Sequence, residues 1–226
     1  MICKAILTLA VAALLFMPAA ARADTTTIPS AAPMPPTPTA AEAPFVTKAT
    51  IDLNKLYPTP KSAEDAGYKR FTDEDSSGSI SYANGNWTSS DADHPSQLWY
   101  SVDGRLLGAD YSVPYAAERP TLFGIDPSRW IRIGAHVHYG LVGPNETTIY
   151  GGTGGPKWAA AGGSLTAPTA AQLVNAGIAK NASDVRFVFP FPAIWDLQIW
   201  VLPNPNGAFA DKNPNVVPSH PQGMNM

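Results

Sequence analysis

The sequence predicts a mainly β domain, an antiparallel barrel or sandwich with one or two short helices. Apolar and polar residues alternate through several short segments, and turn-forming dipeptides separate these segments. The 226 residues include 23 prolines, about twice the usual share. Because proline interrupts helices, helical bundles and coiled coils are excluded.

Six segments have the pattern of strands. They cover residues 97–102, 105–113, 130–142, 147–150, 185–189 and 194–202. Asp103-Gly104 predicts a hairpin with a primed turn between the first two segments. A glycine-rich turn is expected at residues 151–155. Thr169 and Gln172 have capping-box spacing, which predicts a helix starting there, and a shorter helical turn is expected after Ser62.

The first 23 residues have the organisation of an export signal. Lys4 supplies a positive charge, an apolar run follows, and Ala21-Arg22-Ala23 has the pattern of a cleavage site. The apolar run is shorter than the ~20 residues that a bilayer-spanning helix needs, and no later run approaches that length. We therefore expect an exported bacterial protein, periplasmic or secreted, with no membrane span after processing.

The remaining chain divides by composition. Residues 24–44 are rich in proline and alanine and predict a disordered linker, since they cannot bury enough apolar surface to offset the entropy of ordering. Residues 45–226 suit a single β-rich domain with an irregular C-terminal tail. The one cysteine, Cys3, lies in the signal, so no disulfide is expected in the processed chain. The formal charge of −3 and the lack of a basic block argue against a nucleic-acid partner.

His136 and His138 are the leading candidate site. Residues two apart in a strand project from the same face, so the two imidazoles can converge on one Zn or Cu ion. Glu146, eight residues beyond His138, is a candidate carboxylate ligand to the same metal. The alternative is a pair of surface histidines on the solvent face of a sheet.

Two tryptophans fall on faces predicted to be polar, Trp130 in one strand and Trp200 in another. If these strands are neighbours, their polar faces wall a pocket beside the two histidines. The predicted pocket residues are Trp130, Arg132, Asp196, Gln198 and Trp200. The alternative is that the tryptophans pack in the core.

Residues 73–84 resemble the calcium loop of EF-hands. Asp73, Asp75 and Ser77 occupy the first three oxygen positions, but Asn84 stands where the loop needs a bidentate glutamate. We favour a solvated acidic turn over a weak Ca²⁺ site. The C-terminal residues 220–226 hold one histidine and two methionines, which are soft Cu(I) ligands or simply a frayed end.

Residues 98–114 and 195–214 resemble a group of uncharacterised exported bacterial proteins, in which a Trp-rich strand runs into an Asn-Pro-x-Gly-x-Phe-Ala segment. Such relatives often carry a histidine in that strand, where this chain has Gln198. The His-x-His strand followed by a carboxylate partly resembles the cupin pattern. The spacing from His138 to Glu146 is longer than in that family, and no second motif with a third histidine follows.

These patterns favour an exported binding protein with a His-based transition-metal site and a small-molecule or metal ligand. One alternative is a cupin-like metal-dependent enzyme, in which a metal-bound water or one histidine acts on a small polar substrate. A third interpretation is a carbohydrate- or protein-interaction module that uses exposed tryptophans. The sequence leaves open whether the protein is an enzyme.

Overall fold

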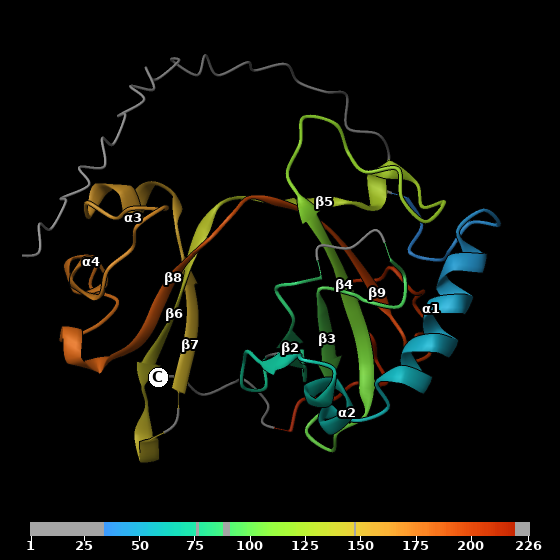
Figure 1. Cartoon of the computed structure of the whole chain (residues 1–226), viewed down its shortest axis with the longest axis horizontal. Coiled ribbons are helices and arrows are strands. Elements are labelled where there is room, and N and C mark those ends of the chain that lie inside the picture. The colour runs from blue at the N-terminus through green and yellow to red at the C-terminus, as the bar shows by residue number, and fades with distance from the viewer. Residues whose placement is uncertain (1–33, 76, 88–90, 147, 220–226) are drawn as a thin grey trace, which may run out of the picture. The chain divides into compact units, whose positions relative to one another are not determined.

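The computed structural model describes residues 34–75, 77–87, 91–146 and 148–219. The predicted signal, linker residues 24–33 and tail residues 220–226 lie outside the described residues. The mainly β prediction is confirmed: the described residues form two antiparallel sheets, of six and three strands. Neither sheet closes into a barrel, so the sandwich-like alternative fits (Figure 1).

The larger sheet has the strand order β1-β2-β3-β4-β9-β5, and the smaller sheet has the order β7-β6-β8. The strands are β1 (Lys69–Arg70), β2 (Ile80–Ala83), β3 (Gln97–Tyr100), β4 (Leu106–Pro114), β5 (Ile131–Ile133), β6 (His136–Val142), β7 (Thr148–Thr153), β8 (Val185–Phe191) and β9 (Ile194–Trp200). The helices are α1 (Ala43–Leu56), α2 (Pro60–Asp65), α3 (Gly155–Ala160) and α4 (Ala170–Asn175), with 3-10 turns at Pro127–Arg129, Pro144–Glu146 and Ala182–Asp184. Among the described residues, no helix is both long and apolar enough to cross a bilayer.

Helix α1 packs on the core face of the larger sheet and lies alongside β4 and β9 in Figure 1. Phe45, Ala49 and Leu53 are spaced four apart, so they share one side of the helix, and all three are buried. Leu197 and Ile199 of β9 belong to the same buried cluster. This helix was not predicted from the sequence.

The described part of the predicted linker, residues 34–44, packs against the domain. The Glu42 side chain is only 1% exposed and forms an ion pair with Arg129, whose Nη2 lies 3.0 Å from Oε2 of Glu42. The Arg129 guanidinium also donates hydrogen bonds to the backbone carbonyls of Pro35 and Thr37. Burial alone would raise the pKa of Glu42, but hydrogen bonds from Arg129 and from two backbone N–H groups lower it to about 2.

The hairpin prediction is confirmed, since β3 and β4 pair antiparallel. The predicted primed turn is wrong: Val102 and Asp103 occupy the centre of the turn without a positive φ, and only Gly104, with a φ of +80°, adopts the left-handed conformation that glycine tolerates without strain. In β9, Leu197 and Ile199 are buried and Gln198 between them is exposed, as the alternation predicts. The capping box at Thr169 is also present at the start of α4.

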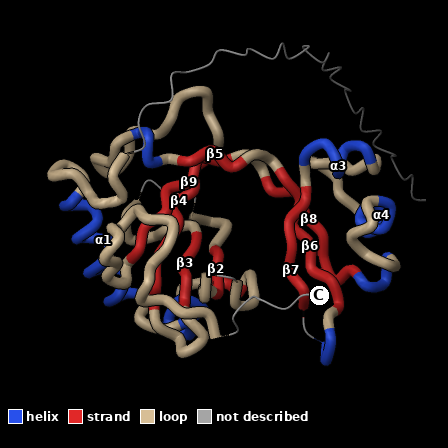
Figure 2. Tube along the Cα trace, turned by 180° about the vertical axis from the view of Figure 1, so that it is seen from behind, coloured by secondary structure: helices blue, strands red, loops and turns tan. Residues whose placement is uncertain are grey.

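The single strand predicted for residues 130–142 is wrong, because Gly134 and Ala135 divide it into β5 and β6. β5 pairs with β9 in the larger sheet and β6 pairs with β8 in the smaller one. The helices α3 and α4 lie beside the smaller sheet in Figure 2. Val137 of β6 packs in a second core with Trp158 of α3 and Leu173 of α4. His136 and His138, one residue on either side of Val137, project from the opposite face of the strand.

The glycine-rich turn predicted for residues 151–155 is largely strand and helix, because β7 runs to Thr153 and α3 begins at Gly155. A Cβ atom added to Gly151 would lie 2.5 Å from the Tyr139 ring on the neighbouring strand. Glycine at position 151 therefore makes room for the Tyr139 ring to pack across the strand pair, and it does not mark a turn.

Candidate functional site

The imidazoles of His136 and His138 meet on one face of β6. Their Nε2 atoms are 2.8 Å apart, which is a hydrogen-bond distance. On the far side of each ring the Nδ1 atom also has a partner. His136 Nδ1 lies 2.8 Å from the carbonyl oxygen of Gly134, and the Tyr150 hydroxyl contacts His138 Nδ1.

These contacts determine which ring nitrogen of each histidine carries the proton when both imidazoles are neutral. The Gly134 carbonyl can only accept, so His136 carries its proton on Nδ1 and its Nε2 atom accepts. His138 then donates from Nε2 to His136, and its Nδ1 accepts from the Tyr150 hydroxyl. The result is one continuous chain of hydrogen bonds from Tyr150 to Gly134.

Aromatic rings enclose His138. The ring centroids of Phe71, Phe189 and Phe191 lie 5.1, 5.4 and 4.9 Å from its imidazole centroid. Burial, and the neighbouring His136, lower the pKa of His138 to about 4. His138 is therefore neutral at pH 7, the form in which imidazole binds a metal.

Glu146 does not join the histidines. Its carboxylate pairs with Arg186 at 3.0 Å and its side chain is 87% exposed, just beyond the Val142 end of β6. In the part of the chain that the structure describes, no three His, Cys, Asp or Glu side chains cluster closely enough to hold a metal ion together. Of the three predicted metal ligands, the structure therefore brings only His136 and His138 together.

The five predicted pocket residues are also not brought beside the histidines. Trp130 is fully buried in the larger core, and the Arg132 guanidinium lies 4.6 Å from the centroid of the Tyr115 ring. The other three, Asp196, Gln198 and Trp200, share one face of β9, in a different sheet from β6.

The calcium-loop residues form a turn. The Asp75 carboxylate accepts hydrogen bonds from the backbone N–H groups of Ser77 and Ser79 and from the Ser77 hydroxyl. Asp73 pairs with Arg70 instead. Asn84 lies beyond the far end of β2 and binds backbone groups there. This arrangement is typical of an aspartate turn.

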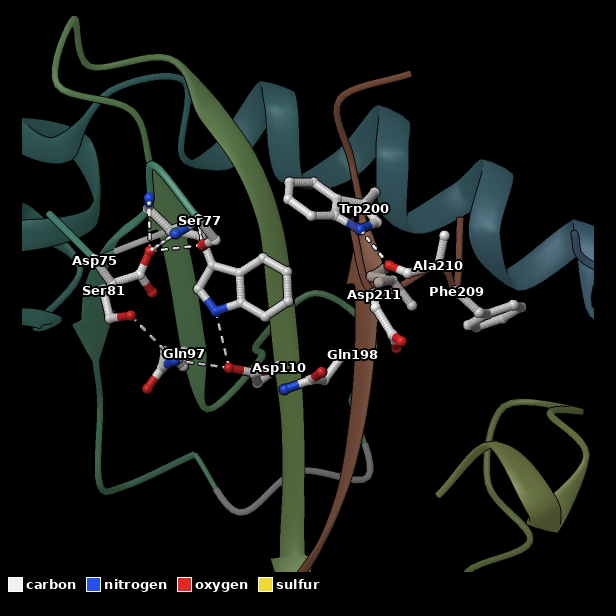
Figure 3. Close-up of a pocket in the computed structure, with 13 residues that line it drawn as sticks. Asp75, Ser77, Ser81, Gln97, Asp110, Gln198, Trp200, Phe209, Ala210 and Asp211 are labelled. Atoms are coloured by element: carbon white, nitrogen blue, oxygen red, sulfur yellow. Dashed lines mark hydrogen bonds between the residues drawn. The ribbon is translucent and has the colours of Figure 1, made fainter. Parts of the chain in front are cut away.

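A pocket of about 230 Å³ opens on the polar face of the larger sheet, where β2, β3, β4 and β9 lie side by side (Figure 3). Aromatic rings, carboxylates, hydroxyls and amides line it, and no lysine, arginine or histidine does. The lining residues are Asp75, Ser77, Ser79, Ser81, Gln97, Trp99, Asp110, Gln198, Ile199, Trp200, Phe209, Ala210 and Asp211.

The hydrogen-bond donors of this pocket are largely occupied by the protein itself. Trp99 Nε1 donates to Asp110 Oδ2 at 2.9 Å, and Gln97 Nε2 donates to the same oxygen at 2.7 Å. Trp200 Nε1 donates to the carbonyl of Ala210 at 2.6 Å. The two indoles therefore offer a ligand carbon surface and π-electrons rather than N–H groups.

Asp110, which lines the pocket, is buried next to a second carboxyl group, that of Asp196. Burial and the neighbouring Asp196 carboxylate raise the pKa of Asp110 well above its usual value. Burial raises the pKa of Asp196 to about 6. Asp110 Oδ1 is buried and has no hydrogen-bond partner among the described residues, and the Ser112 hydroxyl donates to Asp196 at 2.7 Å. Both shifts favour retention of a proton by the pair.

Of the residues that line this pocket, Gln198 and Trp200 were predicted from the sequence, together with the adjacent Asp196, whereas Trp99 and Asp110 were not. The available signal was the alternation in the hairpin, which puts Trp99 on the face opposite Leu98 and Tyr100, both buried in the core. Comparison of the chain with protein-family models, curated proteins and solved structures finds no match. The inferences on function therefore stand on the geometry of the two sites.

Proposed function

We propose that this is an exported binding protein that holds a small organic cation in the pocket between Trp99, Trp200 and Asp110. The observation that carries the proposal is the composition of the pocket wall. Three carboxyl groups and two indole rings line it, and no basic side chain does. Carboxylates and the π-faces of tryptophan both attract a cation.

The pocket suits a ligand that donates hydrogen bonds. Its indole N–H groups are already bound to Asp110 and Ala210. Oxygen acceptors remain on Asp75 and Asp211. A protonated amine supplies positive charge and N–H donors together. The volume of about 230 Å³ is below the ~300–1,000 Å³ of sites for drug-sized molecules, which favours a small amine or amino sugar.

The carboxyl pair links this proposal to pH. A cation beside Asp110 and Asp196 favours their fully ionised form, since it compensates the repulsion between the two charges. We therefore expect ligand binding near pH 7 to release a proton from the pair. An anionic ligand would have the opposite effect.

Two alternatives receive less support. General acid–base catalysis by the carboxyl pair needs both groups to reach a substrate, and Asp196 is only 2% exposed and does not line the pocket. A tryptophan-based interaction surface needs exposed rings, whereas Trp130, Trp158, Trp195 and Trp200 are buried and the remaining two are half-buried. The export signal pattern in residues 1–23 supports a location outside the cytoplasm.

Isothermal titration calorimetry tests the proposal with ethanolamine, choline and glucosamine, and with glucose as the neutral counterpart of glucosamine. We expect at least one cation to bind at least tenfold more tightly than glucose. Asp211→Asn should weaken that binding severalfold, because Asp211 lines the pocket. Asp73→Asn is the matched control, since Asp73 is exposed and pairs with Arg70 outside the pocket.

The same titration also provides the outcomes that would contradict the proposal. Glucose binding as tightly as glucosamine would favour a carbohydrate site and contradict the cation proposal. Binding of no probe, or equal binding by Asp211→Asn and the unmodified protein, would remove its basis. Titration in two buffers of different ionisation enthalpy measures the expected proton release.

A further inference from the structure

We propose that His136 and His138 bind a late first-row transition-metal ion through their Nε2 atoms, Cu²⁺ more tightly than Zn²⁺. This site lies in the smaller sheet and is separate from the pocket of the proposed function. The inference rests on the positions of four nitrogen atoms. The two Nε2 atoms face one another at 2.8 Å, and each Nδ1 atom has an outer partner.

The groups in contact with the two Nδ1 atoms are of the kind that orient metal-bound histidines. A ligating imidazole usually donates its second N–H group to a carbonyl or another oxygen, which orients the ring. His136 already does so, to the Gly134 carbonyl. For His138 the proton moves from Nε2 to Nδ1 and is then donated to the Tyr150 hydroxyl oxygen. Both Nε2 lone pairs then face the ion, and the neutral pair loses no proton.

The distance between the imidazoles is close to that of a chelate. With metal–nitrogen bonds of ~2.0–2.1 Å, two adjacent ligand nitrogens lie roughly 2.9 Å apart in the tetragonal geometry of Cu²⁺ and roughly 3.3 Å apart in the tetrahedral geometry of Zn²⁺. The observed 2.8 Å is therefore close to the Cu²⁺ spacing and needs to open by about half an ångström for Zn²⁺. Phe191 packs against both rings, with ring centroids 4.9 Å from each, so the two imidazoles are held in place before the ion arrives.

The donor type selects the metal. The two rings contact aromatic side chains, a hydroxyl group and a backbone carbonyl, and they present two neutral nitrogens to an ion. Imidazole nitrogen suits copper, zinc and nickel, whereas calcium and magnesium prefer oxygen. Among the divalent ions, Cu²⁺ binds nitrogen sites most tightly. Water completes its coordination.

Titration of the untagged protein with CuCl₂ and ZnCl₂ tests the inference, read out by calorimetry and by electron paramagnetic resonance of bound Cu²⁺. We expect one tight Cu²⁺ ion per chain, with hyperfine coupling to two nitrogens. His136→Ala and His138→Ala should each weaken binding at least tenfold. Tyr150→Phe keeps both ligands and should weaken it about 10- to 100-fold, since it removes an outer partner.

His94→Ala and His220→Ala are the matched controls, because His94 pairs with Asp91 away from β6 and His220 lies in the C-terminal tail. Unchanged Cu²⁺ affinity in His136→Ala and His138→Ala would overturn the inference, as would a loss of binding in His220→Ala alone. Absence of any stoichiometric binding would overturn it too. Circular dichroism of each variant verifies the fold, and His138→Gln provides a second substitution if His138→Ala does not fold.

Discussion

Asp110 of β4 and Asp196 of β9 lie diagonally across two neighbouring strands, on the same face of the larger sheet. In the antiparallel register Asp110 is opposite Gln198, and Asp196 is opposite Ser112. Two acidic side chains from distant parts of the chain are therefore buried together. Their burial together raises the pKa of both carboxyl groups, so we expect the stability of the domain and its proposed ligand binding to depend on pH.

We predict that Asp110→Asn stabilises the protein above neutral pH. An asparagine oxygen can still accept the hydrogen bonds that Gln97 and Trp99 donate, and its NH₂ group can donate to Asp196. The asparagine side chain therefore has the shape of the protonated aspartic acid but cannot ionise as pH rises. At pH 8 the thermal midpoint should rise by about 2–4 °C, equivalent to ~1 kcal/mol in a domain of this size.

The pH profile gives the sign of this effect. The folded-state pKa values of Asp110 and Asp196 are raised, so the unfolded chain releases these protons at lower pH than the folded protein. Stability from the pair is therefore greatest below pH ~4 and falls as pH rises to about 6 and beyond. Thermal melts from pH 4 to 8 should show a weaker fall in Asp110→Asn. The exposed Asp65→Asn serves as control, and an equal change there would contradict the assignment.

Binding of a cationic ligand should strengthen as pH rises from 5 to 7. Asp196 ionises with a pKa of about 6, so a cation at low pH must compete with protons for the pair. The other lining carboxylates are Asp75 and Asp211. Calorimetric affinities at pH 5, 6 and 7 measure the trend, and the Asp110→Asn variant should release fewer protons on binding. A pH-independent affinity is inconsistent with this coupling.

Glu42→Gln should destabilise the domain by about 3–5 kcal/mol, because it leaves the buried Arg129 guanidinium without its counter-charge. The pKa of Glu42 is lowered to about 2, so its stabilisation is present above the usual value near 4.5 and is lost as pH falls towards 2. Urea unfolding at pH 7 measures the loss. Glu64→Gln on the exposed side of α2 should change the unfolding midpoint little.

Gly108→Ala should disturb the pocket through Trp99. A Cβ atom at position 108 would lie 2.5 Å from both the Trp99 ring and the Ile199 carbonyl oxygen, so the indole must move. We expect a loss of about 1–3 kcal/mol of stability and weaker ligand binding. Gly85→Ala is the matched control, since no atom lies within 4 Å of its added Cβ. Urea unfolding and calorimetry distinguish the two variants, and equal effects would exclude a role for the close approach.

Much of the β architecture could be predicted from local patterns. The hairpin at Asp103-Gly104, the capping box at Thr169 and the alternation in β9 each depend on residues close in the chain. The break at Gly134 could not be predicted in this way, because it marks the point at which the chain leaves one sheet and enters the other. Helix α1 was missed because its start lies in a segment rich in alanine and proline.

The sequence by itself determined the β class and which side chains leave each strand together, as for His136 and His138. That follows because successive residues of a pleated strand point to opposite faces, whatever its neighbours are. Only the tertiary structure decided which strands are neighbours. It paired β4 with β9, which set Asp110 beside Asp196, and it put β6 in another sheet from Trp200. Such pairings depend on packing between segments far apart in the chain, so no local pattern contains them.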